Sequence, residues 1–171
     1  MAMMTSAYAN KMLRKLNDDK EFWRAKEEEG SIYMATIDEE PVVPEYDYSE
    51  VSKNIAEIDE KIVRVKHAIN LSNCPNEIQV GDNKLTIDAV LVKMAQLNKR
   101  KAILDNMRKQ LPKIRVTTRA FGARTTIPEY QFINYDLDLV KAEYEKVEEE
   151  VTAMQIALDK YNQTVEFDVT I

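Results

Sequence analysis

Residues 140–161 read VKAEYEKVEEEVTAMQIALDKY, and this stretch decides the fold. Its apolar residues alternate steps of four and three, whereas most positions between them are charged or polar. They are Val140, Tyr144, Val147, Val151, Met154, Leu158 and Tyr161. In an α-helix this spacing places them on one side, so the pattern predicts a long helix with one buried stripe. Asp136 suits the N-cap, and we expect the helix to cover residues 136–162.

A second regular stripe lies earlier in the chain. It consists of Val51, Ile55, Ile58, Ile62, Val65 and Ile69, which again alternate steps of four and three. Asp47 and Glu50 precede it with the spacing of a capping box. The pattern predicts a helix over residues 49–73. Two heptad stripes of this regularity are typical of helices that pack as a coiled coil.

Two further helices are predicted from less regular patterns. Over residues 6–29, the larger apolar side chains lie near one stripe. Gly30 is expected to end this helix, because glycine favours helix termini. Over residues 86–111, Asn98 and Lys101 crowd a broader stripe, which predicts a local polar contact or a drift of the buried face. The residues of the first stripe are Tyr8, Met12, Leu16 and Trp23, with Phe22 beside them.

The segments between the helices predict short β-elements. Three of them are rich in β-branched and aromatic residues, which favour strands. The C-terminal segment alternates apolar and polar side chains, as in a half-buried strand. Two prolines hold a fourth segment extended. The predicted elements are a strand at 31–37, an extended linker at 38–46, two strands at 114–118 and 130–135, and a C-terminal strand at 164–171.

Glycine and proline are rare in this chain and confined to the connections. The three glycines and five prolines all lie between the amphipathic stretches. Glycine lacks a Cβ and proline lacks an N–H, so both disfavour helix interiors. The sequence therefore predicts a mainly α fold, an elongated antiparallel helical bundle of four long helices with short β-strands or a hairpin at the bundle ends. We expect a single domain over residues 1–171.

The charges are segregated along the chain. Residues 27–60 hold twelve carboxylates and one basic residue, whereas residues 93–124 hold ten basic residues and one acid. This separation favours contact between oppositely charged surfaces, within a subunit or between subunits. The N-terminal residues show no apolar core of a secretory signal, and no apolar run approaches the length of a membrane helix. We therefore expect a cytoplasmic protein without a membrane span.

No arrangement of side chains typical of an enzyme is recognisable. His67 is the only histidine and Cys74 the only cysteine, so one chain cannot form a common His/Cys zinc site. His67 lies off the stripe and is expected to face solvent, and Cys74 is expected to be buried or inert. The carboxylates from Glu148 to Glu150 are expected to form a solvated face. We predict no catalytic residues, no cofactor and no metal.

The basic segment between the last two helices is the best candidate for binding. It carries Lys113, Arg115, Arg119 and Arg124. Arginine binds phosphate and carboxylate groups in bidentate fashion. Two interpretations stay open: these cations meet the acidic segment of the same or a neighbouring subunit, or they bind nucleic acid, with Phe121 available for stacking. The first is favoured, because the chain is acidic overall and carries no nucleic-acid-binding motif.

Several short motifs follow one another in an order shared with a known family. They are Ile69-Asn70-Leu71-Ser72-Asn73, Lys84-Leu85-Thr86, Arg124, Glu129, Phe132, the segment from Leu158 to Gln163, and Phe167. On these motifs, residues 51–171 resemble the septicolysin-like family of small helical bacterial proteins. The family usually shows Asn-Trp where this chain has Glu166-Phe167, and a basic residue in place of Ile127. The resemblance implies no established activity, although the family name suggests a cytolysin.

The sequence predicts a structural or interaction protein rather than an enzyme. The regular helix stripes and the edge of the C-terminal strand favour a homo-oligomer that associates through helix faces and edge strands. That strand pairs either within the chain or with another subunit. Two alternatives stay open: a membrane-active, cytolysin-like protein that would release dye from liposomes, and a nucleic-acid or anion-binding protein that uses the basic segment.

Overall fold

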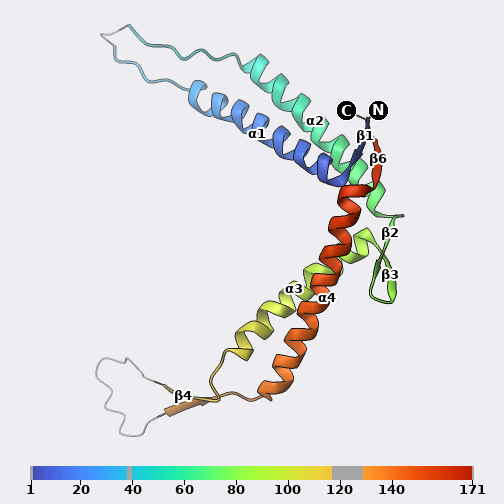
Figure 1. The fold of residues 1–171 in the computed structure, drawn as a ribbon. Coiled ribbons are helices and arrows are strands. Elements are labelled where there is room, and N and C mark those ends of the chain that lie inside the picture. The colour runs from blue at the N-terminus through green and yellow to red at the C-terminus, as the bar shows by residue number, and fades with distance from the viewer. Residues whose placement is uncertain (1, 38–39, 117–128, 171) are drawn as a thin grey trace, which may run out of the picture. The chain divides into compact units, whose positions relative to one another are not determined.

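The computed structural model describes residues 2–37, 40–116 and 129–170, and most of these residues are helical (Figure 1). The helices are α1 (Ser6–Gly30), α2 (Tyr48–Asn73), α3 (Ile87–Arg108) and α4 (Leu137–Thr164). The strands are β1 (Ala2–Thr5), β2 (Glu77–Val80), β3 (Asn83–Thr86), β4 (Lys113–Val116), β5 (Glu129–Phe132) and β6 (Glu166–Val169). The mainly helical class with short β-elements is therefore confirmed. The arrangement of all four helices in one bundle stays a prediction.

The chain divides into two compact units. The first consists of Met1–Asp88 and Ala157–Ile171, and the second of Ala89–Ile156. The division falls inside α3 and α4, so each of these helices contributes residues to both units. The prediction of one domain over the whole chain stays a prediction.

In the first unit, α1 and α2 lie side by side and antiparallel (Figure 1). The stripe predicted on α2 faces α1, since Ile58, Ile62 and Val65 are buried in one cluster with Ala9 and Leu13. Apolar area removed from water stabilises the pair by roughly 25 cal/mol per Å². The predicted α2 stripe is therefore confirmed as the core of this helical pair.

The stripe predicted on α1 was partly wrong. Tyr8 is exposed, and the buried positions are Ser6, Ala9 and Leu13. The predicted stripe consisted of large apolar side chains, whereas the small Ala9 is fully buried in the cluster with α2. Met12 and the other members of the predicted stripe are only partly buried, at the edge of the cluster.

Side-chain caps fix the starts of α2 and α4 as predicted. Asp47 Oδ1 accepts hydrogen bonds from the backbone N–H groups of Ser49 at 2.7 Å and Glu50 at 3.2 Å. Asp136 Oδ1 accepts from Asp138 at 2.9 Å and from the next residue at 3.2 Å. These bonds satisfy N–H groups that have no partner inside the helix. Gly30 is the last residue of α1, also as predicted.

The two ends of the chain pair with each other. β1 and β6 are antiparallel, with Met4 opposite Phe167 and Ala2 opposite Val169. Met4 and Val169 are buried in the core cluster of the first unit. The C-terminal strand thus pairs within the chain, and it is shorter than predicted because α4 continues to Thr164. β1 was not predicted, because it has only four residues and little alternation.

A hairpin and a buried hydrogen bond complete the first unit. β2 and β3 pair around Gly81, whose φ of +57° is strained for any residue with a side chain. The hydroxyl groups of Ser72 and Tyr161 are 2.8 Å apart, and both residues are buried. This bond joins the end of α2 to the end of α4 within the first unit.

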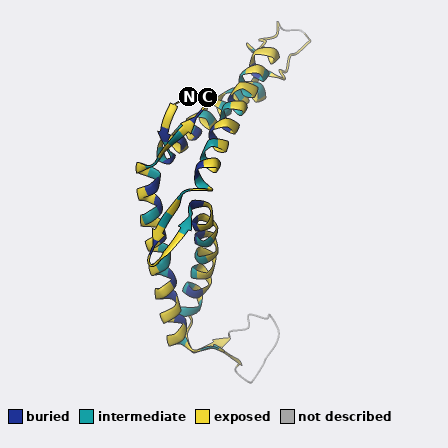
Figure 2. Cartoon of the chain, turned by 90° about the vertical axis from the view of Figure 1, so that its right-hand side faces the viewer, coloured by how far each residue is buried: buried dark blue, intermediate teal, exposed yellow. Residues whose placement is uncertain are grey.

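The connection between α1 and α2 corrects the prediction of a strand at 31–37. These residues form neither helix nor strand in the described part of the chain, and residues 40–46 are equally irregular, as predicted for the linker. β-Branched residues favour a strand only where a partner strand and a surface to cover are present. Here the side chains of Ile32, Met34 and Ile37 are exposed instead. Figure 2 colours the described part of this connection mostly as exposed.

The first and last residues of this connection approach each other closely, at the end of α1 and just before the start of α2. A Cβ atom on Gly30 would lie 2.7 Å from the Cβ atom of Tyr46, so only glycine fits there without a shift of the backbone. Loss of solvent around Tyr46, followed by the negative charge of Glu27, raises the pKa of the Tyr46 phenol above its ordinary value. The start of the connection is therefore packed, and the exposed residues lie beyond it.

In the second unit, α3 and α4 run antiparallel. Lys93 pairs with Glu150 and Arg100 with Glu143, which fixes the direction. Leu104 is buried with Val140, Tyr144 and Val147 in one cluster, so the regular stripe of α4 is confirmed as core. α3 ends three residues before the predicted position, at Arg108. Among the described residues, no helix is long and apolar enough to cross a membrane.

Candidate functional site

Of the four basic residues proposed for binding, the structure describes two. Lys113 and Arg115 lie on β4, whereas Arg119 and Arg124 lie outside the described residues. β4 and β5 form an antiparallel pair, which confirms the predicted β-excursion, although β5 ends at Phe132 rather than at Tyr135.

The register of this pair creates one face with a defined chemistry. Lys113 is opposite Phe132, and Arg115 is opposite Tyr130. Because side chains alternate along a strand and opposite residues share a face, these four side chains lie on the same side of the ribbon. We call these four residues the ribbon face.

Contacts within the ribbon face join one of its cations, Lys113, to both aromatic rings. The Nζ atom of Lys113 lies 4.1 Å from the ring centroid of Tyr130 and 5.5 Å from that of Phe132. The two ring centroids are 6.5 Å apart. All four residues are exposed. Among the described residues, neither Lys113 nor Arg115 has an ion-pair partner.

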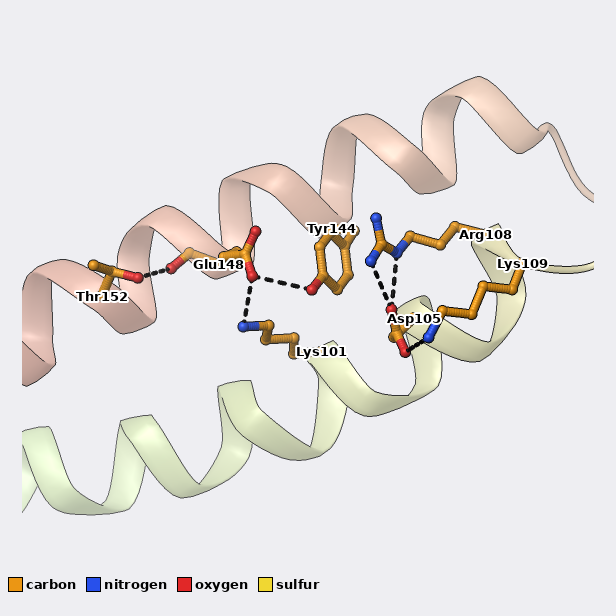
Figure 3. Close-up of polar contacts among 7 residues, drawn as sticks. All are labelled: Lys101, Asp105, Arg108, Lys109, Tyr144, Glu148 and Thr152. Carbon is orange, nitrogen blue, oxygen red and sulfur yellow. Dashed lines mark hydrogen bonds and ion pairs between the residues drawn. The ribbon is translucent and has the colours of Figure 1, made fainter.

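The cations of α3 have a different role, which the sequence analysis had not assigned. Lys101 Nζ lies 2.8 Å from Glu148 Oε1, and Tyr144 donates its hydroxyl hydrogen to the same oxygen at 3.0 Å (Figure 3). Lys93 and Arg100 also pair with carboxylates of α4. The basic part of α3 therefore meets the acids of α4 rather than the acidic segment at 27–60. The predicted polar contact at Lys101 is confirmed.

Glu148 and Glu150, which were expected on a solvated face, form ion pairs with α3 while their side chains stay 46% and 34% exposed. The position of these carboxylates on α4 brings them next to the basic residues of α3. Among the described residues, no group of three or more His, Cys, Asp or Glu side chains is arranged to hold a metal ion.

A second cluster lies one turn further along α3. Asp105 accepts hydrogen bonds from Arg108 and Lys109, and the guanidinium carbon of Arg108 lies 3.8 Å from the ring centroid of Tyr144 (Figure 3). The hydrogen bonds from Lys109 and then Arg108 lower the pKa of the Asp105 carboxyl. The hydrogen bond from Lys101, followed by that from Tyr144, lowers the pKa of Glu148.

These shifts predict how stability depends on pH. A carboxyl group whose pKa is lowered by folding stabilises the folded state when the pH is above the pKa of the unfolded chain, which is near 4.5 for Glu148. This stabilisation is lost as the pH falls through the pKa of the folded state. The hydrogen bond to Glu148 raises the pKa of Lys101, so its contribution persists at neutral pH and fades only above about 10.5. We therefore expect the melting temperature to decrease when the pH is lowered below about 4.5. In Glu148→Gln this decrease should be less steep. Thermal melts from pH 7 to pH 3 measure this.

Glu149→Gln is the matched control for that experiment, because Glu149 is the exposed neighbour of Glu148 and has no ion pair among the described residues. It should keep the wild-type pH profile. Equal profiles for wild type and Glu148→Gln would contradict the role assigned to the pair with Lys101.

A depression of about 570 Å³ lies between α2 and β6, and it gathers His67, Ser72 and Asp168 in its lining. These are the residue types of a serine hydrolase. The Ser72 hydroxyl, however, is buried and hydrogen-bonded to Tyr161, so it is not free to act as a nucleophile. His67 is exposed, as predicted. The depression therefore offers no activated serine.

Cys74, which was expected to be buried or inert, is exposed. It follows α2 directly as the C-cap residue. The predicted absence of a reactive cysteine stays a prediction.

Comparison with known proteins bears on the fold alone. No family model matches this chain, and no curated protein is similar in sequence. A solved structure of a functionally unknown conserved protein from Corynebacterium diphtheriae is similar, with a TM-score of 0.70 over 98% of this chain and 100% of that chain. The two sequences are 15% identical, so the likeness concerns the fold. The resemblance to the septicolysin-like family stays a prediction.

Proposed function

We propose that this chain is a non-enzymatic interaction protein that self-associates through exposed apolar segments outside its helix stripes. The observation that carries the proposal is the exposure of the connection between α1 and α2. Met34 is 98% exposed and Val42 is 91% exposed, and Ile32 and Ile37 are similarly open. Large apolar side chains exposed in this way are typical of interaction sites.

The helix stripes themselves do not provide this surface. Ile58 and Val65 on α2, and Val140 and Val147 on α4, are buried within the chain. Association through these faces would require the helical pairs to open. The exposed segments, in contrast, gain roughly 25 cal/mol for each Å² of apolar area that a partner covers.

Strand edges give the proposal a second route. Within the described residues each sheet has two strands, so each strand has one edge without a neighbouring strand. Unpaired backbone N–H and C=O groups on such edges are a template for pairing with another chain. This supports the association through edge strands that the sequence predicts.

The proposal is tested by light scattering on the purified protein between low and high micromolar concentration. We expect the average mass to rise above the monomer mass of 19.8 kDa as concentration increases. The expected cause is burial of the exposed apolar segments, so the rise should persist at moderate ionic strength. A strict monomer at high micromolar concentration would remove the proposal.

A further inference from the structure

We infer that one copy of this chain docks the exposed part of its α1–α2 connection on the ribbon face of a second copy. The docking part, which we call the tip segment, consists of residues 32–37 and 40–43. This inference rests on the proposed function and specifies which two surfaces meet. It follows from three observations on the described residues. The tip segment combines apolar side chains with nearby carboxylates, the ribbon face combines aromatic rings with cations, and charged groups on each surface have no ion-pair partner.

The tip segment combines apolar side chains with unpaired carboxylates. Met34, Ile37 and Val42 are almost fully exposed. Glu28, Glu29, Glu40 and Glu45 flank them, and none of these four has an ion-pair partner among the described residues. The acidic segment does hold ion pairs, but they lie further along α2, where Glu57 and Glu60 meet basic residues of the same helix and Asp59 meets Lys20. Among the described residues, the carboxylates near the tip segment therefore belong to the part of the acidic segment that holds no ion pair.

The ribbon face has the complementary composition. Its rings, Tyr130 and Phe132, are 42% and 63% exposed, and its cations, Lys113 and Arg115, have no carboxylate partner among the described residues. Five other cations of this region have carboxylate partners: Lys93, Arg100 and Lys101 pair with α4, and Arg108 and Lys109 pair with Asp105. Aromatic rings beside arginine are typical of the residues that contribute most to protein interfaces.

Charge complementarity argues for a second copy as the occupant. Opposite charges across an interface steer the approach of partners and fix their register, while the apolar groups supply the burial. Each copy offers both surfaces, so every copy is a complement for another. Because the two surfaces differ, the contact is heterologous and leads to a closed ring or to a growing chain of copies.

Two variants separate this contact from other modes of association. Met34→Ser with Ile37→Ser disables the tip segment and leaves the ribbon face intact. Lys113→Glu with Arg115→Glu disables the ribbon face and leaves the tip segment intact. All four residues are exposed, so the helix cores are untouched, and circular dichroism spectra should match that of the wild type.

Sedimentation velocity then measures wild type, each variant alone, and their equimolar mixture. We expect the wild type to form species larger than a dimer, and each variant alone to need a concentration about tenfold higher or more for association. In the mixture, the variant with the altered tip segment supplies an intact ribbon face, and the variant with the altered ribbon face supplies an intact tip segment. One contact can therefore form, and the two remaining surfaces of the pair are disabled. The mixture should therefore form a 1:1 pair with twice the monomer mass of 19.8 kDa, and nothing larger.

Matched control variants carry the same chemical changes elsewhere. Leu139→Ser with Ile156→Ser removes exposed apolar side chains of α4, and Lys99→Glu with Lys146→Glu reverses exposed charges on α3 and α4. Both controls should associate as the wild type does. Loss of association in either control to the same degree as in the test variants would overturn the assignment of the two surfaces.

The remaining outcomes distinguish this inference from the proposed function. If the wild type stays monomeric, both fail. If the wild type associates and either test variant associates equally well, the contact between tip segment and ribbon face is wrong and self-association stands. A mixture that stays monomeric, although each variant has lost association, also overturns the contact. The contact is also overturned if the wild type binds single-stranded DNA at low salt through the ribbon face while Lys113→Glu with Arg115→Glu leaves association unchanged.

Discussion

A Leu104→Ala variant is expected to lose about 2–5 kcal/mol of unfolding free energy, the usual cost of such a truncation in a packed core. Leu104 is 1% exposed and is buried with Val140, Tyr144 and Val147. Removing three side-chain carbons leaves a cavity that two packed helices can only partly close. Denaturant titration followed by circular dichroism measures the loss.

Ile103→Ala is the matched control, because the neighbouring Ile103 is 52% exposed on the other side of α3. Its cost should be below about 1 kcal/mol, since little apolar area returns to water. Similar losses in the two variants would contradict the placement of Leu104 between α3 and α4.

A Val169→Asp variant is expected to lose about 3–5 kcal/mol, because it places a charge without a partner in the core of the first unit. Val169 is fully buried next to Met4, where β6 pairs with β1. The new carboxylate must either stay unpaired or pull β6 away from β1. We expect a lower denaturation midpoint and faster proteolysis near both termini.

Thr170→Asp adds the same charge at the next position, which is exposed. It should leave the midpoint almost unchanged. If Thr170→Asp destabilises the chain as strongly as Val169→Asp, then β6 does not pack against the core with the face that the structure assigns.

Local patterns were sufficient to predict the helices, and the reason is visible in individual positions. The heptad stripes on α2 and α4 were located to the residue, since Ile58, Val65 and Val147 are buried. Asp47 and Asp136 cap the predicted starts. Periodicity and capping depend on neighbours within a few residues, so a sequence expresses them directly.

The candidate site could be predicted only in part. Sequence alternation placed the basic residues on a strand, but the aromatic half of the ribbon face depends on the register that brings Tyr130 opposite Arg115. The pairing of Lys101 with Glu148 joins residues 47 positions apart and was not visible as a pair. Both were outside the reach of local patterns, because they depend on which element packs against which.

The sequence by itself determined four long amphipathic helices, the buried stripes of α2 and α4, and the two caps. These follow from the spacing of apolar residues and from side chains close to the backbone that they cap. Only the tertiary structure decided that β1 pairs with β6, that the basic side of α3 meets the acids of α4, and that residues 31–37 form no strand. Each of these depends on whether a segment distant in sequence supplies a complementary strand edge, charge or apolar surface. Such segments come together only when the chain folds, so no single stretch of sequence specifies the contact.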